Sequence, residues 1–159
     1  MIFITLGTQN VQFERLLKEI DRLIDNKIIC EKVIVQSGFT NYKSNNFETK
    51  KLLSINELNK LIKKADLIIT HGGVGSILDA IKENKKVIAI PRLKEFNEAA
   101  NNHQEQIINK FAELGYIKAC NNITNLENIY LNINKFKPKK FIGNNKNFVT
   151  QLINYIDNN

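Results

Sequence analysis

The chain is poor in cysteine, proline, glycine and tryptophan: its 159 residues include 2 Cys, 2 Pro, 7 Gly and no Trp. Two cysteines cannot build a disulfide framework or a four-cysteine metal site, and we expect Cys30 and Cys120 to be buried, reduced thiols. The scarcity of proline and glycine disfavours a linker-rich chain. No apolar run approaches the roughly 20 residues of a membrane span, and the opening MIFITLG lacks the features of a secretory leader. We therefore expect a cytoplasmic protein.

Arginine is scarce as well, although the chain is basic. The 23 basic residues exceed the 16 acidic ones and give a net charge of +7, yet 20 of them are Lys and only 3 are Arg. A lysine excess attracts anions such as nucleotide phosphates or acidic lipid headgroups. Base recognition in nucleic acids generally uses arginine and aromatic platforms. The composition thus favours an anionic small molecule over a nucleic acid.

Short apolar runs alternate with amphipathic segments along the chain. Strands are predicted at 2–6, 33–36, 67–70, 87–90 and 116–119, with a weaker one within 47–53. Helices are predicted at 13–24, 56–65, 77–84, 101–114, 124–134 and 147–157. Asn56 is the expected cap of the second helix, and Gly115 the residue that ends the fourth.

This alternation predicts a parallel sheet with helices on both faces. We predict one α/β domain over residues 1–159, a Rossmann-like, doubly wound sheet of about six strands, with a C-terminal helical part at 119–159. Ligands of such domains bind at the carboxyl ends of the strands, where the strand order reverses. The loops that follow the strands are therefore the candidates for function.

The sharpest motif is THGGVGS at 70–76, between a predicted strand and a helix. Glycines let backbone N–H groups approach an anion, and the helix N-terminus that begins at Val74 favours negative charge there. The spacing is neither the dinucleotide fingerprint nor a P-loop. The candidate phosphate cradle consists of His71, Gly72, Gly73, Val74, Gly75 and Ser76. A tight turn that needs glycine for packing is the alternative, although packing leaves His71 beside the glycines unexplained.

Three further features of the sequence could complete the crevice: Asp79, the pair Gly7 and Thr8, and the segment 101–106. Asp79 lies one helical turn past Ser76, where it could accept hydrogen bonds from a ribose; the alternative is a solvated carboxylate. Gly7 and Thr8 follow the first strand and would face the same crevice, unless they form an ordinary turn. The uncharged donors and acceptors of NNHQEQ at 101–106 suit sugar hydroxyls, with a capped helix N-terminus as the alternative.

The sequence gives little support for other chemistry. The two histidines, His71 and His103, lack the spacing of metal ligands, so we expect no metal site. No nucleophile-elbow motif accompanies them, which disfavours a hydrolytic triad. The basic run KFKPKKF at 135–141 fits a solvated connection anchored by its two phenylalanines, with a membrane surface or an acidic partner as the alternative.

The segments DLIITHGGVGSILDAI (66–81) and NHQEQIINKFAELGYI (102–117), together with TLGT near the start, resemble the donor-binding half of the GT-B glycosyltransferases. The similarity covers about residues 1–118. It is strongest to the small subunits of two-component transferases, both of dolichol-linked glycan synthesis and of bacterial capsule and exopolysaccharide synthesis. The wider family includes the peptidoglycan enzymes that use a UDP-sugar.

The resemblance implies a role for each candidate residue. The backbone at Ser54 and Ile55 would meet the uracil edge, and the loop 71–76, helped by Gly7 and Thr8, would hold the diphosphate. Asp79 would take the ribose, with a reach one methylene shorter than the glutamate common in the family. The sugar would be faced by Asn102, His103 and Gln104.

The resemblance further implies a donor-binding catalytic subunit of an inverting UDP-sugar transferase in polysaccharide synthesis, with UDP-galactose as the first choice of donor and UDP-N-acetylglucosamine as the second. The general base and the lipid-linked acceptor would belong to a membrane-associated partner subunit, which would recruit the chain to the inner face of the membrane. No cofactor or metal is expected. The alternatives are a non-catalytic enhancer subunit, a UDP-binding regulatory module, and an epimerase or hydrolase of UDP-sugars.

Overall fold

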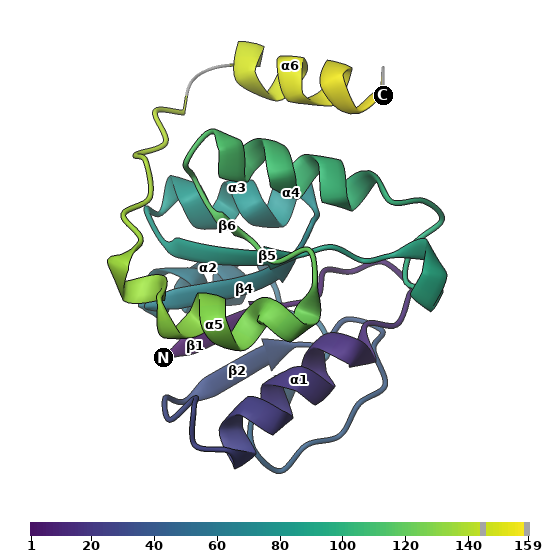
Figure 1. The fold of residues 1–159 in the computed structure, drawn as a ribbon, viewed down its shortest axis with the longest axis vertical. Coiled ribbons are helices and arrows are strands. Elements are labelled where there is room, and N and C mark those ends of the chain that lie inside the picture. The colour runs from purple at the N-terminus through teal and green to yellow at the C-terminus, as the bar shows by residue number, and fades with distance from the viewer. Residues whose placement is uncertain (144–145, 158–159) are drawn as a thin grey trace.

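A computed structural model describes residues 1–143 and 146–157. One parallel sheet of six strands runs through the centre of the molecule (Figure 1). In chain order its strands are β1 (Ile2–Thr5), β2 (Val33–Gln36), β3 (Glu48–Lys50), β4 (Leu67–His71), β5 (Lys86–Ile90) and β6 (Lys118–Ala119). Their spatial order is β3-β2-β1-β4-β5-β6, with β1 central. The predicted doubly wound α/β fold is confirmed; β3 lies within the range predicted for a weaker strand, and β6 is shorter than the strand predicted at 116–119.

Helices cover both faces of the sheet (Figure 1). Helices α1 (Glu14–Asp25) and α5 (Leu126–Leu131) contribute to one apolar core, and α2 (Ile55–Lys64), α3 (Val74–Lys82) and α4 (His103–Glu113) to the other. Neighbouring residues of β1 feed opposite cores, since Ile2 and Ile4 join the first and Phe3 the second. A strand buried on both faces must be apolar at every position, which explains its unbroken apolar run.

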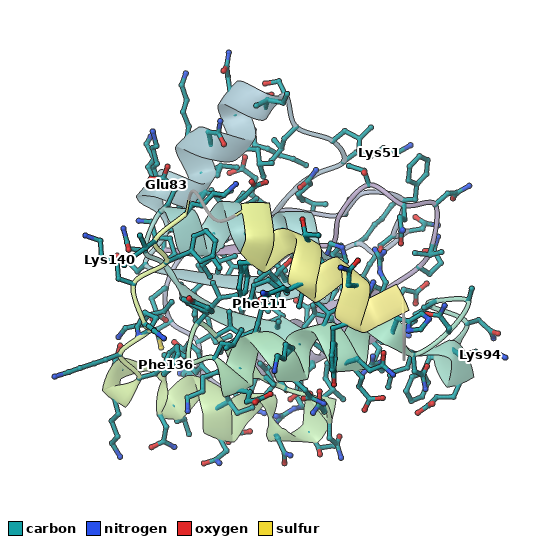
Figure 2. The ribbon with its side chains drawn as sticks, turned by 90° about the horizontal axis from the view of Figure 1, so that it is seen from above. Lys51, Glu83, Lys94, Phe111, Phe136 and Lys140 are labelled. Atoms are coloured by element: carbon teal, nitrogen blue, oxygen red, sulfur yellow. The ribbon has the colours of Figure 1, made fainter. Side chains whose placement is uncertain are left out.

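The last helix, α6 (Lys146–Asp157), packs on the outer side of α4 (Figure 1). Phe111 of α4 is buried near the middle of the molecule in Figure 2, and its ring lies 5.9 Å from the ring of Phe148 in α6. The exposed side chains of Lys51, Lys94 and Lys140 lie at the periphery of the same view. The closing helix thus adds a further apolar layer over the core beneath α4.

Several local predictions need correction. The cap of α2 is Ser54 and not Asn56: Ser54 Oγ accepts from the N–H of Glu57, and the Glu57 carboxylate accepts from the N–H of Ser54. This reciprocal pair is a capping box, whose S-x-x-E signature the sequence carries. The helix predicted at 124–134 is broken into α5 and the flanking 3₁₀ turns η2 (Ile123–Asn125) and η3 (Ile133–Lys135). The 3₁₀ turn η1 (Lys94–Phe96) in the loop after β5 was not predicted.

Other local predictions hold. Gly115 ends α4 with φ of +82°, and the N–H of Tyr116 reaches back to the carbonyl of Phe111, as in a Schellman motif. Phe136 and Phe141 pack against the two cores and anchor the basic connection between them. Cys120 is buried as expected, whereas the prediction for Cys30 is wrong because this thiol is exposed. In the described part of the chain, no helix is long and apolar enough to span a bilayer.

The topology places a crevice at the carboxyl ends of β1 and β4. The helix after β1 packs on one face of the sheet and the helix after β4 on the other, so their connections diverge from neighbouring strands. Thr5 and Thr70 are register partners, which aligns the ends of the two strands. The loop at Gly7 therefore faces the loop that follows Thr70, at the point where the strand order reverses.

Candidate functional site

A pocket of about 220 Å³ lies in this crevice. It gathers seven of the predicted site residues: Gly7, Thr8, His71, Gly73, Gly75, Ser76 and Asp79. A larger cavity of about 610 Å³ opens at the opposite edge of the sheet, near Asp66 and Tyr130. Because ligands of doubly wound sheets bind beyond the carboxyl ends of the strands, the smaller pocket is the functional candidate.

His71 is packed between two glycines. An added Cβ would lie 2.6 Å from His71 Cε1 at Gly7 and 2.3 Å from His71 Nε2 at Gly73. The imidazole is only 7% exposed. Burial, reinforced by the positive charge of Arg92, lowers the pKa of His71 to about 4, so the ring is neutral near pH 7. Packing therefore does explain His71 beside the glycines, contrary to the expectation from the sequence.

The other two glycines of the loop differ from one another. A Cβ on Gly72 would lie 2.6 Å from Gln104 Cβ, so this glycine permits the close approach of α4. A Cβ on Gly75 would meet no non-neighbouring atom of the described chain within 4 Å. Gly75 faces open space at the pocket, and no contact within the described chain requires a glycine there. Of the three loop glycines, it alone leaves room for a ligand.

The N-terminus of α3 supplies donors beside this space. The first backbone hydrogen bond of the helix runs from the N–H of Ile77 to the carbonyl of Gly73. The preceding N–H groups, those of Val74, Gly75 and Ser76, thus have no partner within the helix. Gly73 is the N-cap and has no side chain to satisfy them. These groups, together with the positive end of the helix dipole, suit an anionic group in the pocket.

The remainder of the pocket wall was not among the predicted site residues. It comprises Thr5, Gln9, Gln36, Leu58, Ile62 and Ile68. Gln36 ends β2 and is nearly buried, and its Oε1 accepts a 2.8 Å hydrogen bond from the Thr5 hydroxyl. A polar residue that closes an apolar strand run was the available signal for Gln36. Leu58 and Ile62 lie four residues apart on one face of α2, the apolar spacing that is typical of an amphipathic helix.

Three predicted sugar contacts belong to the first turn of α4, which borders the crevice without lining the pocket. Gln104 Oε1 accepts from the N–H of Gly72 at 3.0 Å and from the N–H of Arg92 at 2.9 Å. Asn102 Oδ1 accepts from the N–H of Lys94 at 2.9 Å. His103 Nδ1 lies 3.2 Å from Gln106 Oε1. Gln104 thus joins the start of α4 to the glycine loop, and Gln104 and Asn102 join it to the loop after β5. Any contact with a sugar stays a prediction.

Ser54 and Ile55 also lie outside the pocket. Ser54 is engaged in the capping box of α2, and the Ile55 side chain is 77% exposed. Their predicted contact with a base would use the backbone, but the N–H of Ser54 already donates to the Glu57 carboxylate and its carbonyl accepts from the N–H of Leu58. The predicted contact would therefore fall mainly to the backbone of Ile55. In the described part of the chain, no group of three His, Cys, Asp or Glu side chains could hold a metal ion.

A partly buried ion pair between Arg15 and Glu98 holds the loop that leads into α4. The Arg15 guanidinium in α1 donates to both oxygens of Glu98, at 3.0 and 2.8 Å, and to the Pro91 carbonyl at 2.9 Å. Glu98 also accepts from the N–H of Leu93 at 3.1 Å. This pair joins positions 83 residues apart, so no local sequence pattern predicts it.

Solved structures with this fold include an NMR structure of ALG13, with a TM-score of 0.64 and 24% identity, covering 98% of this chain and 96% of that one. The glycosyltransferase of kitacinnamycin also has a TM-score of 0.64, with 13% identity over 99% of this chain and 38% of that one. At these identities the likeness shows the fold alone. The fold is that of a GT-B half-domain.

The chain belongs to the family described as glycosyltransferase family 28 C-terminal domain, which it matches over residues 1–156. UDP-N-acetylglucosamine transferase subunit ALG13 of Candida albicans is 33% identical over 117 residues, which are 74% of this chain and 37% of that protein. The UDP-N-acetylglucosamine--N-acetylmuramyl-(pentapeptide) pyrophosphoryl-undecaprenol N-acetylglucosamine transferase of Prochlorococcus marinus subsp. pastoris is 29% identical over 149 residues, 88% of this chain and 39% of that protein. The chain thus spans less than half the length of these relatives.

Proposed function

We propose that the chain binds a UDP-sugar in the crevice and is the donor-binding part of an inverting glycosyltransferase. Family membership supports transfer of a sugar, and the names of the relatives support a uridine nucleotide as its carrier. The observation that carries the proposal is Gly75, where a Cβ would enter open space beside the unpaired N–H groups of α3. An anion such as a diphosphate suits these donors and the positive end of the helix dipole.

Each part of the pocket has a role in this proposal. The N–H groups at the start of α3 and the Ser76 hydroxyl hold the diphosphate, with the backbone of Gly7 and Thr8 opposite. As the bond to the sugar breaks, negative charge grows on the departing UDP, and these preorganised donors stabilise it. Asp79 accepts from the ribose. The backbone at Ser54 and Ile55 meets the uracil, and the first turn of α4 faces the sugar.

The donor is the finer part of the proposal. The names of the relatives specify UDP-N-acetylglucosamine, and we place it first. UDP-galactose, favoured by the resemblance to capsule and exopolysaccharide enzymes, is the second choice and has no support among the relatives reported above. Specificity between the two sugars depends on a few hydroxyl contacts, which we assign to the first turn of α4.

The acceptor side is proposed to lie on another polypeptide. The ALG13 relatives are named as transferase subunits, which supports a partner subunit for this chain. We propose that the partner is membrane-associated, binds a lipid-linked acceptor, supplies the general base and holds the chain at the cytoplasmic face of the membrane. No metal is proposed to take part in the reaction.

The test is ligand-observed NMR on the purified chain with UDP, UDP-N-acetylglucosamine, UDP-galactose and GDP-mannose. Asp79→Asn weakens UDP binding about tenfold, which corresponds to about 1.4 kcal/mol of ribose hydrogen bonding. The matched control is Glu83→Gln, because Glu83 is exposed at the opposite end of α3 (Figure 2). GDP-mannose that competes as well as UDP, or binding of none of the four, contradicts the proposal.

Co-expression with the partner subunit separates catalysis from activation. A donor-binding catalytic subunit loses transfer in Asp79→Ala, whereas an enhancer tolerates this change of an exposed side chain. Gln104→Ala is compared separately, because it also removes the acceptor of the N–H groups of Gly72 and Arg92. A regulatory module would bind UDP without preference for any sugar and would need no partner.

A further inference from the structure

Arg92 is a buried cation behind the pocket. It follows β5 and Pro91, and its side chain is 1% exposed. The guanidinium donates to the carbonyl of Leu6 and, from Nη1, to Gln9 Oε1 at 3.2 Å. Its Nε is buried and has no hydrogen-bond partner in the described part of the chain. The partners of this charge are therefore neutral groups only.

The nearest candidate counter-ion is already engaged. Glu98 accepts both hydrogen bonds of the Arg15 fork, and a further one from the N–H of Leu93. Glu98 and Arg15 thus balance one another. Among the described residues, Arg92 forms no ion pair with a carboxylate.

An unpaired buried charge is costly, because several kcal/mol of solvation are lost per ion. Burial lowers the pKa of Arg92 to about 10, which still leaves the group protonated near pH 7. A hydrophobic residue of similar volume would avoid the cost. Glu98 raises the pKa of Arg92 through space, but its hydrogen bonds go to Arg15 and Leu93. The position therefore retains a charge that has no direct counter-ion among the described residues.

Arg92 holds a loop that lines the pocket, so its positive charge lies behind that part of the pocket wall. Leu6 and Gln9, its two acceptors, flank Gly7 and Thr8, and the three residues from Gly7 to Gln9 line the pocket. The same charge helps to lower the pKa of His71, which also lines the pocket. Arg92 does not line the pocket itself.

We propose that Arg92 is a positioning residue for the diphosphate: it fixes the Leu6–Gln9 loop from behind and supplies the positive charge that a bound pyrophosphate group balances. The inference rests on the proposed function and adds to it a residue that would not touch the ligand. The preferred ligand class follows from the charge. A nucleoside diphosphate benefits more than a monophosphate, and a nucleoside does not benefit.

Calorimetry with UDP, UMP and uridine tests the inference on four proteins: the wild-type chain, Arg92→Met, Arg92→Lys and Arg22→Met. Arg92→Met weakens UDP binding at least tenfold and uridine binding less than twofold. Arg92→Lys binds UDP more tightly than Arg92→Met but more weakly than wild type, because lysine carries a positive charge but lacks the guanidinium fork that reaches both Leu6 and Gln9. Arg22→Met is the matched control, because it removes one positive charge from the exposed face of α1 and leaves all three affinities unchanged.

A second measurement tests the inference on the wild-type chain, even if Arg92→Met fails to fold. The wild-type chain has 3 Arg, so ¹⁵N-arginine labelling gives three Nε–H signals, which Arg15→Lys and Arg22→Lys assign by elimination. UDP shifts the Arg92 signal, and uridine does not. A wild-type chain that binds no uridine nucleotide defeats the proposed function. A chain that binds UDP while Arg92→Met loses UDP and uridine equally, or whose Arg92 signal ignores UDP, overturns this inference alone.

Discussion

The backbone N–H of Gly72 donates a 3.0 Å hydrogen bond to the side chain of Gln104, which joins the glycine loop to the first turn of α4. The two residues are 32 positions apart, and the contact is possible only because Gly72 carries no side chain. A Cβ at this position would lie 2.6 Å from Gln104 Cβ and 2.9 Å from the Gln104 carbonyl oxygen. The two segments that the sequence analysis treated as separate motifs thus form one structural unit.

Gly72→Ala is therefore expected to destabilise the chain. The backbone of α4 must move to relieve the contact, and such overpacking costs about 1–3 kcal/mol. Urea unfolding measures the loss as a lower midpoint with an unchanged slope. A variant as stable as wild type would show that α4 is not held against the loop in solution.

Gly75→Ala is expected to have the opposite effect on stability. The added methyl meets no other part of the described chain, and alanine within a helix is favoured over glycine by about 0.5–1 kcal/mol. The same methyl occupies the space proposed for the diphosphate, so UDP affinity falls at least tenfold. The two results together are diagnostic, because a variant that is more stable than wild type but binds UDP more weakly has lost ligand contacts without losing its fold. Unchanged UDP binding would remove Gly75 from the site.

The contrast among these glycines shows how far the sequence could predict the site. The pattern THGGVGS located the crevice correctly, since strand order and motif position depend on local periodicity. The pattern could not tell that Gly73 makes room for His71, that Gly72 makes room for Gln104 and that Gly75 faces open space. These neighbours are set by the tertiary fold. The capping box at Ser54 could be predicted from its S-x-x-E signature. The burial of the charged side chains of Arg15, Arg92 and Glu98 could not. Charged residues are mostly exposed, so nothing local marks these three.

Glu98→Gln tests the anchor of the loop before α4. The amide cannot accept both hydrogen bonds of the Arg15 fork and leaves that guanidinium unpaired and mostly buried, at a cost of about 2–3 kcal/mol. Thermal unfolding should show the loss, and amide hydrogen exchange should rise at Leu93, whose N–H donates to Glu98. The control is Glu14→Gln, which breaks an exposed pair with Lys18 and should stay within about 0.5 kcal/mol of wild type. Equal effects of the two changes would contradict an anchoring role.

The stability of the chain is expected to fall in mild acid because His71 is buried in its neutral form. Its pKa is lowered from 6.5 to about 4 in the folded state. Between those values the unfolded chain binds a proton that the folded chain excludes, so the stabilisation is complete above pH 6.5 and is lost as the pH falls towards 4. From pH 7 to pH 5 the loss is about 2 kcal/mol. Urea unfolding at several pH values measures this slope directly.

The substitution that isolates this effect is His71→Gln, with His103→Gln as the matched control. His71→Gln lowers stability at every pH, since the ring fills the space between Gly7 and Gly73, but it flattens the dependence between pH 7 and pH 5. The window stops at pH 5 because carboxylates with lowered pKa, such as Glu31 and Asp66, lose their own stabilisation in stronger acid. If the slope survives in His71→Gln and disappears in His103→Gln, the buried imidazole is not its source. A slope absent from the wild-type chain would mean that the ring between the two glycines is open to water and accepts a proton in the folded state.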